Sequence, residues 1–263
     1  MKILFDPKKQ PMRVACFMSG SGTNVRRIIE HQKKLEEEKG ELPYEVVLIF
    51  TDNPESNAEK IANEYWISFV INDVKKFYGD KDLKNMSIRK EYDKKTLELI
   101  EPFDIDVIAL GGYALILTDP IVTRYLIVNV HPADLSITEK GKKKYVGLHD
   151  IPPRKAILAG EKFLHSSTHI VTKNLDQGEV LLISKGLKVE LPSGITLQDL
   201  KKPENEQLLK KIAKEHQSKL KEVGDWKIFP LTLEWIAEGR FAIDDDRNIY
   251  FDGKLINNGY RLE

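Results

Sequence analysis

An amide and an imidazole stand at the end of one apolar stretch of this chain. Residues 125–130 predict a strand, and Asn129 and His131 lie two positions apart, so both side chains point to the same face. Asparagine donates without charge, and histidine can hold or release a proton near pH 7. Such a pair suits an oxyanion that forms during a reaction. A histidine that only makes a structural hydrogen bond at the strand end remains an alternative.

A carboxylate in a later loop is a candidate partner for this histidine. Asp176 lies in residues 175–178, between expected strands at 168–171 and 180–184. A carboxylate close to His131 would raise the pKa of the imidazole and fix its orientation. An Asp-x-Gly sequence is also a common turn, so the loop alone does not establish a catalytic role.

A glycine-rich turn follows the first predicted strand. Residues 19–24 read Ser-Gly-Ser-Gly-Thr-Asn and lie where a strand passes into a helix, a place where backbone N–H groups favour an anion. The dinucleotide fingerprint fails because Val25 occupies its last glycine position, and no Gly-Lys-Ser/Thr of a phosphate-binding loop follows. Gly22, Thr23 and Asn24 therefore predict a monophosphate or carboxylate site, with a ligand-free turn as the alternative.

The other histidines do not predict a metal site. His165 and His169 are four residues apart, but in a strand that spacing corresponds to about 13 Å, too far for one ion. No cysteine pair exists, since Cys16 is the only cysteine. The lysine-rich residues 140–144 predict a solvated loop, or a cationic rim that attracts anionic substrates.

The elements that position these residues alternate between strand and helix. This alternation predicts an α/β fold with an open, mostly parallel, Rossmann-like sheet and helices on both faces. Ligands of such sheets bind beyond the carboxyl ends of the strands, where the glycine turn and His131 are expected. The expected strands are 14–18, 45–50, 68–71, 106–110 and 125–130, and the expected helices are 24–38, 58–65 and 88–100.

The last third of the chain departs from this alternation. A polar helix is expected over 208–223 and an amphipathic helix over 231–237, after Pro230. Residues 241–251 predict a C-terminal antiparallel hairpin with an acidic turn. Without a repeat or a low-complexity linker, the chain is expected to form a single domain over residues 1–263.

Composition excludes several classes of protein. The chain has 263 residues and 41 basic against 41 acidic side chains, so a protein that binds nucleic acid through a broad basic field is not expected. Neither a signal peptide nor a run of about 20 apolar residues is present. The sequence thus predicts a cytoplasmic protein that acts on small molecules, without a membrane or nucleic-acid partner, as a monomer or homodimer.

Taken in order, these segments resemble the folate-dependent formyltransferases, specifically the members that formylate glycinamide ribonucleotide in purine biosynthesis. The resemblance covers nearly the whole chain. It rests on residues 18–24, 110–117, 129–132, 147–149, 167–178, 228–231, 235, 238–240 and 252–253.

The resemblance implies roles for particular residues. Asn129, His131 and Asp176 would transfer a formyl group from the co-substrate 10-formyltetrahydrofolate to the substrate amine, with no metal: Asn129 and protonated His131 stabilise the oxyanion and Asp176 relays protons. The acceptor would be bound by Gly22, Thr23, Asn24 and Asp225. The pterin would be bound by Tyr113, Ala114, Leu115, Ile116, Leu117 and Val171. Residues 1–110 would then be the phosphate-binding half, and residues 111–263 the folate-binding and catalytic half.

The sequence departs from this family at four places, which leaves the formyl acceptor open. Ala133 to Ser136 replace Ser-Leu-Leu-Pro, Ala114-Leu115 replace a frequent Met-Arg pair, and segments 76–98 and 193–220 are longer. Alternatives are a transferase for another amine such as a sugar amine, formyltetrahydrofolate hydrolase, or, more distantly, a nucleotide-binding module. The hydrolase carries an additional N-terminal regulatory domain, whereas about a dozen residues precede the first strand here.

Overall fold

The computed structural model describes residues 1–80, 82 and 85–263, and its centre is an eight-stranded sheet. The strand order is β16-β11-β10-β6-β5-β2-β3-β4. The strands from β6 to β4 are parallel to one another, and β10 is antiparallel to both β6 and β11. These strands span Met12–Met18 (β2), Tyr44–Thr51 (β3), Ser68–Ile71 (β4), Val107–Leu110 (β5), Leu126–His131 (β6), Ser167–Ile170 (β10), Val180–Ile183 (β11) and Tyr260–Arg261 (β16). The prediction of a mostly parallel sheet is confirmed.

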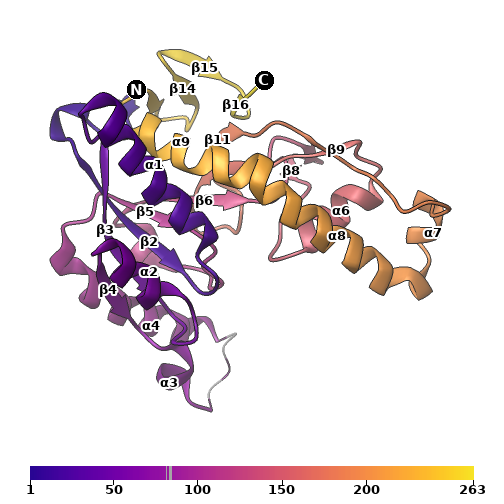
Figure 1. Ribbon diagram of the computed structural model, residues 1–263, viewed down its shortest axis with the longest axis horizontal. Helices are drawn as coiled ribbons and strands as arrows, with labels where there is room; N and C mark the ends of the chain where they lie inside the picture. The colour runs from indigo at the N-terminus through magenta and orange to yellow at the C-terminus, as the bar shows by residue number, and fades with distance from the viewer. Residues whose placement is uncertain (81, 83–84) are drawn as a thin grey trace.

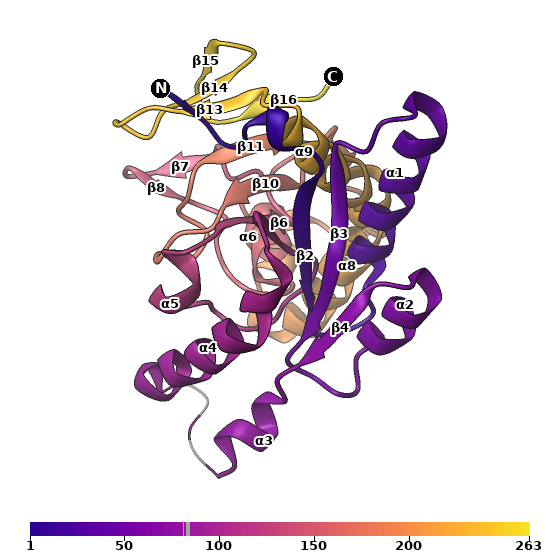
Figure 2. The same cartoon turned by 90° about the vertical axis from the view of Figure 1, so that its left-hand side faces the viewer.

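Both faces of this sheet are buried under helices (Figure 2). Along β2, Val14, Cys16 and Met18 enter one hydrophobic cluster, and Ala15 and Phe17 enter another on the opposite face. A central strand covered on both sides explains the unbroken apolar run in the sequence. The helices span Thr23–Lys39 (α1), Ala58–Tyr65 (α2), Val74–Tyr78 (α3), Met86–Ile100 (α4), Asp119–Val122 (α5) and Trp226–Ala237 (α9).

The switch in strand order of the sheet lies between β2 and β5. From β2 the chain proceeds outward to β3 and β4, then returns to the other side of β2 as β5 and β6. The loops that follow β2 and β5 therefore diverge at the carboxyl edge of the sheet, and a crevice between them is the usual ligand site of such folds.

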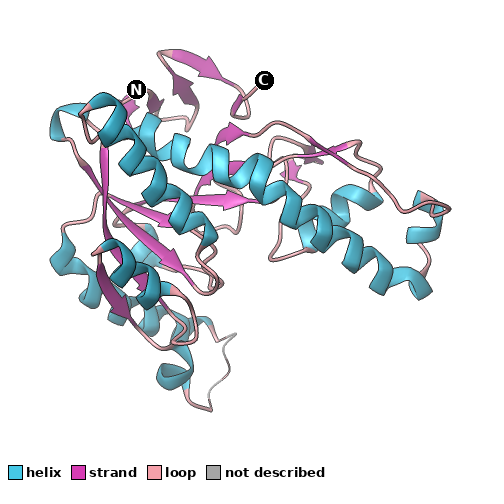
Figure 3. Cartoon of the chain, in the orientation of Figure 1, coloured by secondary structure: helices cyan, strands magenta, loops and turns pink. Residues whose placement is uncertain are grey.

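A separate lobe lies beside the carboxyl end of β6 and the amino end of the antiparallel β10 (Figures 1 and 3). It is held by its own cluster of buried side chains, among them Tyr145, Ile157, Leu164, Leu209 and Ile212. Its elements are α6 (Ile151–Leu158), β9 (Phe163–Leu164), β12 (Leu187–Lys188), α7 (Leu197–Leu200) and α8 (Glu206–Leu220). The long segment 193–220 thus supplies much of this lobe.

The last helices differ from the sequence prediction. A π-helical turn, Lys221–Asp225, joins α8 to α9. The helix predicted to begin after Pro230 begins instead at Trp226 and contains Pro230. Pro230 lies inside this helix and removes one backbone N–H from it, and the burial of Ile228, Phe229 and Leu233 on the same helix outweighs that local signal for a boundary.

The predicted C-terminal hairpin is present and belongs to a second sheet. β13 (Phe241–Ile243) pairs with β14 (Ile249–Phe251), which pairs with β15 (Lys254–Ile256). β1 (Lys2–Ile3) adds to the other side of β13, and the two ends of the chain lie on the same side of the molecule (Figure 1). A short hairpin of β7 (Thr138–Glu139) and β8 (Lys142–Lys143) occupies the lysine-rich segment.

Candidate active site

A cleft of about 300 Å³ opens at the switch point of the sheet. The loops after β2, β5 and β6 and the later loop that contains Asp176 meet there. Its walls are residues 20–24, 111–114, 129–132 and 147–149, with Asp176, Gln217, Lys221 and Asp225. All three predicted catalytic residues and all four predicted acceptor-binding residues therefore line one cleft.

The glycine turn at one end of the cleft depends on Gly22. This residue precedes α1 with a left-handed φ of 70°, and a Cβ there would lie 2.4 Å from Cδ1 of Ile61. No side chain caps the first turn of this 17-residue helix, and Thr23 and Asn24 of that turn line the cleft. Free N–H groups and the helix dipole together favour an anion.

Asn24 and Asp225 form the polar wall next to this turn. Asp225 is buried, and its Oδ1 accepts a 2.5 Å hydrogen bond from the Ser166 hydroxyl. Burial raises the pKa of Asp225, while hydrogen bonds with Ser166 and Asn24 act in the opposite direction. Within the described part of the chain, the buried Oδ1 of Asn24 has no hydrogen-bond partner. It is thus available to a donor on a bound ligand.

Asn129 is oriented by a histidine on the neighbouring strand. Its Nδ2 lies 3.1 Å from Nε2 of His169, and Nδ1 of His169 lies 3.0 Å from the Ile170 carbonyl. A carbonyl only accepts, so His169 carries its proton on Nδ1 and accepts from Asn129 through Nε2. Burial, helped by the charge of Lys143, lowers the pKa of His169 to about 3, which keeps this imidazole neutral.

His131 is fixed from its other side by a backbone carbonyl. Its Nε2 lies 2.7 Å from the Tyr145 carbonyl, so Nε2 carries the proton. Nδ1 then faces Oδ1 of Asp176 at 3.7 Å. The second oxygen of Asp176 accepts from the Gly147 N–H at 3.0 Å. The amide, the imidazole and the carboxylate that were predicted to converge from distant segments do lie together.

The protonation state of His131 differs from the sequence expectation. Asp176 does raise the pKa of His131, but burial lowers it more strongly, so the pKa lies below its ordinary value. His131 is only 3% exposed, and its Nδ1 does not reach hydrogen-bond distance of the carboxylate. In the free protein this imidazole is therefore a neutral base with its lone pair on Nδ1, not a standing imidazolium.

The comparison with known proteins assigns this arrangement to a family. Residues 12–211 match the model of the Formyl transferase family. The chain belongs to the formyl transferase family. The family membership predicted from the sequence is confirmed, and the matched range contains the glycine turn, both strand-end residues and Asp176.

Relatives with full-length similarity have related names. Phosphoribosylglycinamide formyltransferase of Escherichia coli (strain K12) is 27% identical over 255 residues, which cover 96% of this chain and 100% of that protein. The enzyme of the same name from Haemophilus influenzae is 25% identical over 254 residues, which cover 95% of this chain and 99% of that protein. The structure of phosphoribosylglycinamide formyltransferase from Coxiella burnetii has a TM-score of 0.68 at 21% identity, covering 97% of this chain and 100% of that chain. This structural similarity supports the fold.

The segment expected to bind pterin is divided between two cavities in this family member. Tyr113 and Ala114 line the central cleft. Ile116 and Leu117 line an adjacent cavity of about 320 Å³. The other two expected residues pack into hydrophobic clusters: Leu115 against Val74, Tyr78 and Tyr92, and Val171 against the cluster that covers the second face of the sheet.

Some residues of the cleft were not predicted from the sequence. Gln217 and Lys221 line it from α8 and the π-helical turn, and His149 lines it after β8. His169 belongs to the segment that resembled the family, but its role in orienting Asn129 was not foreseen. In the sequence, only the unusual length of residues 193–220 indicated that α8 contributes residues to the cleft.

Neither a metal site nor a membrane helix appears in the described residues. No group of three or more His, Cys, Asp or Glu side chains there is arranged to hold an ion. No helix among those residues is both long and apolar enough to cross a bilayer.

Proposed function

We propose that this protein transfers the formyl group of 10-formyltetrahydrofolate to the amine of glycinamide ribonucleotide. The observation that carries the proposal is the position of Asn129, His131 and Asp176 in the same cleft as an anion-binding helix terminus. A formyl acceptor with a phosphate can therefore be anchored at one end while its amine meets the reacting groups at the other. The relatives that match along their whole length carry the corresponding name.

The phosphate of the acceptor is proposed to bind at the glycine turn. Gly22, Thr23 and Asn24 line the cleft at the uncapped start of α1, and Lys221 adds a positive charge to its wall. The carboxylate of Asp225 and the unpartnered Oδ1 of Asn24 are acceptors for ribose hydroxyl groups. This set favours a phosphorylated ribose over an unphosphorylated amine.

The folate co-substrate is proposed to lie along residues 113–117. Tyr113 and Ala114 border the reacting groups, and Ile116 and Leu117 border the adjacent cavity, so an extended molecule can occupy both. Two buried side chains of α4 hold this segment from behind. Arg89 Nε donates to the Ile116 carbonyl at 2.8 Å, and Asp93 accepts from the Thr118 N–H at 2.6 Å. Leu115 and Val171 then act as support behind the pocket, not as contacts.

In the proposed reaction, Asn129 stabilises the negative charge and His131 transfers the proton. As the amine nitrogen bonds to the formyl carbon, the N–H of Asn129 that is not used by His169 stabilises the oxyanion. Nδ1 of His131 takes the proton that the attacking nitrogen loses, and Asp176 stabilises the imidazolium. The same proton is then given to the departing folate nitrogen as the carbonyl re-forms. A neutral His131 in the free protein is the state from which this cycle begins.

The test is a formyl-transfer assay with three acceptors. Purified protein and 10-formyltetrahydrofolate are incubated with glycinamide ribonucleotide, with its nucleoside lacking the phosphate, or with water alone. We expect tetrahydrofolate and formylated ribonucleotide in equal amounts, a large loss of kcat/KM without the phosphate, and almost no release in water. Release that is independent of the amine would favour hydrolysis, and turnover only with another amine, such as a sugar amine, would refute the acceptor while preserving the chemistry.

The remaining sequence expectations complete the proposal. We propose that residues 1–263 act as a single domain, since the largest cluster of buried side chains extends from Phe5 to Phe251. With a formal net charge of zero, the protein is proposed to act on small molecules without nucleic acid, as a monomer or homodimer. A single, buried cysteine is consistent with a reducing compartment such as the cytoplasm.

A further inference from the structure

The loop that contains Asp176 is held tightly on its inner side. Asp176 has a left-handed φ of 55°, and its carboxylate accepts from the Gly147 N–H. Two residues later, a Cβ on Gly178 would lie 1.8 Å from the Ile170 carbonyl oxygen, so the loop rests directly on the end of β10. The position of the Asp176 carboxylate relative to His131 therefore depends also on the contacts that the rest of this loop makes, on what is called here its outer side.

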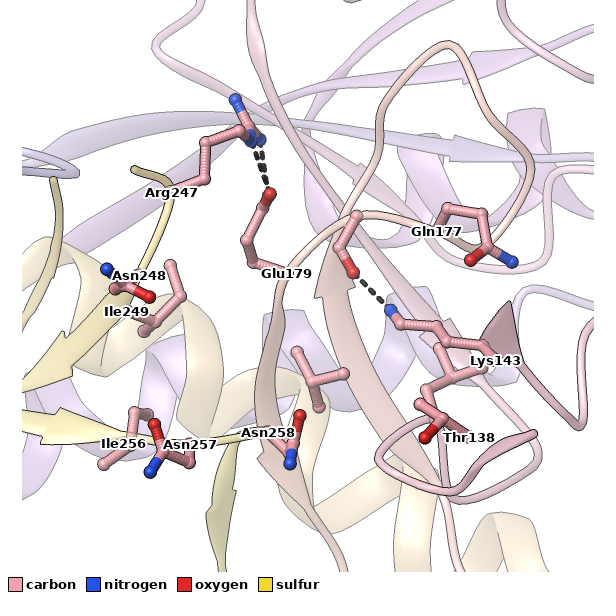
Figure 4. A pocket seen from close by; sticks show the side chains of 13 residues that line it. Thr138, Lys143, Gln177, Glu179, Arg247, Asn248, Ile249, Ile256, Asn257 and Asn258 are labelled. Atoms are coloured by element: carbon pink, nitrogen blue, oxygen red, sulfur yellow. Dashed lines mark hydrogen bonds and ion pairs between the residues drawn. The ribbon is translucent and has the colours of Figure 1, made fainter. Parts of the chain in front are cut away.

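One lysine of the β7–β8 hairpin contacts that outer side. Nζ of Lys143 donates a hydrogen bond to the Gly178 carbonyl, as Figure 4 shows. Its neighbours Lys140 and Lys142 are exposed, whereas Lys143 is half-buried between the hairpin and the loop. The lysine-rich segment, expected to be a solvated loop or a rim of the cleft, thus places one ammonium group behind the catalytic loop.

The positive charge of Lys143 affects the pKa of both imidazoles of the site. It lowers the pKa of both His131 and His169, and Asp176 and Glu179 in turn raise the pKa of Lys143. Burial nevertheless lowers the pKa of Lys143 to about 8. The carboxylate of Glu179 is engaged at 2.5 Å by the Arg247 guanidinium, also seen in Figure 4. Lys155 is the other cation that lowers the pKa of His131.

A cavity of about 470 Å³ borders Lys143 and shares no lining residue with the active-site cleft. Thr138, Gln177 and Asn258 line it together with the Arg247–Glu179 pair (Figure 4). This space allows a longer or differently shaped side chain at position 143 without displacing the core. Substitutions of Lys143 therefore test its charge and hydrogen bond and not the packing of the sheet.

We propose that Lys143 is a positioning residue for formyl transfer: its ammonium group fixes the Asp176 loop through Gly178 and keeps His131 neutral before the amine attacks. This inference rests on the proposed function. While Lys143 is protonated, the loop is tied and the charge opposes early protonation of His131. When Lys143 loses its proton above about pH 8, the ammonium charge disappears and its hydrogen bond to Gly178 weakens.

The experiment compares Lys143→Met with Lys143→Arg, and uses Lys142→Met in the exposed part of the same hairpin as the control. We expect Lys143→Met to lower kcat by about ten- to hundredfold with little change in KM, since small misplacement of a catalytic group has effects of this size. The fall in kcat that the wild type shows above pH 8 should be absent in Lys143→Met and shifted to higher pH in Lys143→Arg. Arginine should restore most of kcat because it keeps the charge.

A second readout is independent of turnover. Titration of His131 and His169 by NMR in Lys143→Met should show a higher pKa for His131 than in the wild type, and Lys142→Met should leave it unchanged. Identical kcat, pH profile and His131 pKa in Lys143→Met and wild type would overturn the role of Lys143. Absence of transfer by the wild type would instead refute the proposed function, and the NMR titration would still decide whether Lys143 controls His131.

Discussion

Replacing Asp176 by Asn tests the proposed proton cycle most directly. The carboxylate lies 3.7 Å from Nδ1 of His131, the atom proposed to become charged during the reaction. At an effective dielectric constant of about 20, a unit charge pair at this distance is worth about 4 kcal/mol. That interaction exists only once His131 is protonated. Its loss therefore raises the free energy of the transition state relative to the bound substrates, and kcat should fall by about 10³-fold.

The same substitution should leave the fold intact. Asn tolerates the left-handed φ of 55° at this position, and its amide oxygen can still accept from the Gly147 N–H. We therefore expect an unchanged Tm and an unchanged affinity for the acceptor. Asp252→Asn, which removes an exposed carboxylate 2.6 Å from Arg240 at another left-handed position, with a φ of 48°, is the matched control and should retain full activity.

The assay follows tetrahydrofolate release at saturating concentrations of both substrates across pH. In the wild type, the acidic limb should lie below pH 6.5, since burial lowers the pKa of His131 and the base is active only when neutral. In Asp176→Asn it should move lower still, because the carboxylate that favours the charged form is gone. An Asp176→Asn protein that keeps more than a tenth of the wild-type kcat, or whose acidic limb moves upward, would refute this reasoning.

Three other substitutions probe how the site is built. Gly22→Ala should lower the free energy of unfolding by about 1–3 kcal/mol in urea titrations and raise KM for the phosphorylated acceptor, since its Cβ would be placed 2.4 Å from Cδ1 of Ile61. Asp93→Asn should cost about 3–5 kcal/mol by the same measurement and raise KM for the folate, because it leaves the buried Arg89 without its carboxylate. His169→Gln should reduce the slope of the free energy of unfolding against pH by about 1.4 kcal/mol per pH unit between pH 6.5 and about 3. Neutral His169 stabilises the fold above that pH range, and this stabilisation is lost as the pH falls through the range.

The parallel part of the fold could be predicted because its signals are local. Each of the expected parallel strands lies within two residues of its observed bounds, since the central strands, which are buried on both faces, form continuous apolar runs. The convergence of Gly22 and His131 followed from topology, because the carboxyl ends of parallel strands share one edge. Bringing Asp176 to that edge required the resemblance to a family, since its loop follows an antiparallel strand.

The features that sequence reasoning missed depend on tertiary packing. The helix predicted over 208–223 is present as α8, but its packing with α6 and α7 into a lobe depends on contacts between segments that are far apart in the chain, and the short α6 and α7 carry little periodic signal. Leu115 appeared suitable for an apolar pocket but packs against Tyr78 and Tyr92. The half-burial of Lys143 depends on the hairpin fold, which the lysine-rich sequence does not reveal.

The hydrogen bonds of the two histidines explain why only one of them can act as the base. Oδ1 of Asp176 lies 3.7 Å from Nδ1 of His131 and equally far from Nε2 of His169. A proton on Nε2 of His169 would remove the acceptor that orients Asn129, so protonation there would cost the oxyanion donor. A proton on Nδ1 of His131 breaks no such contact, because its Nε2 already donates to Tyr145. The carboxylate thus stabilises charge on His131 alone, and the neutral His169 keeps the amide in place.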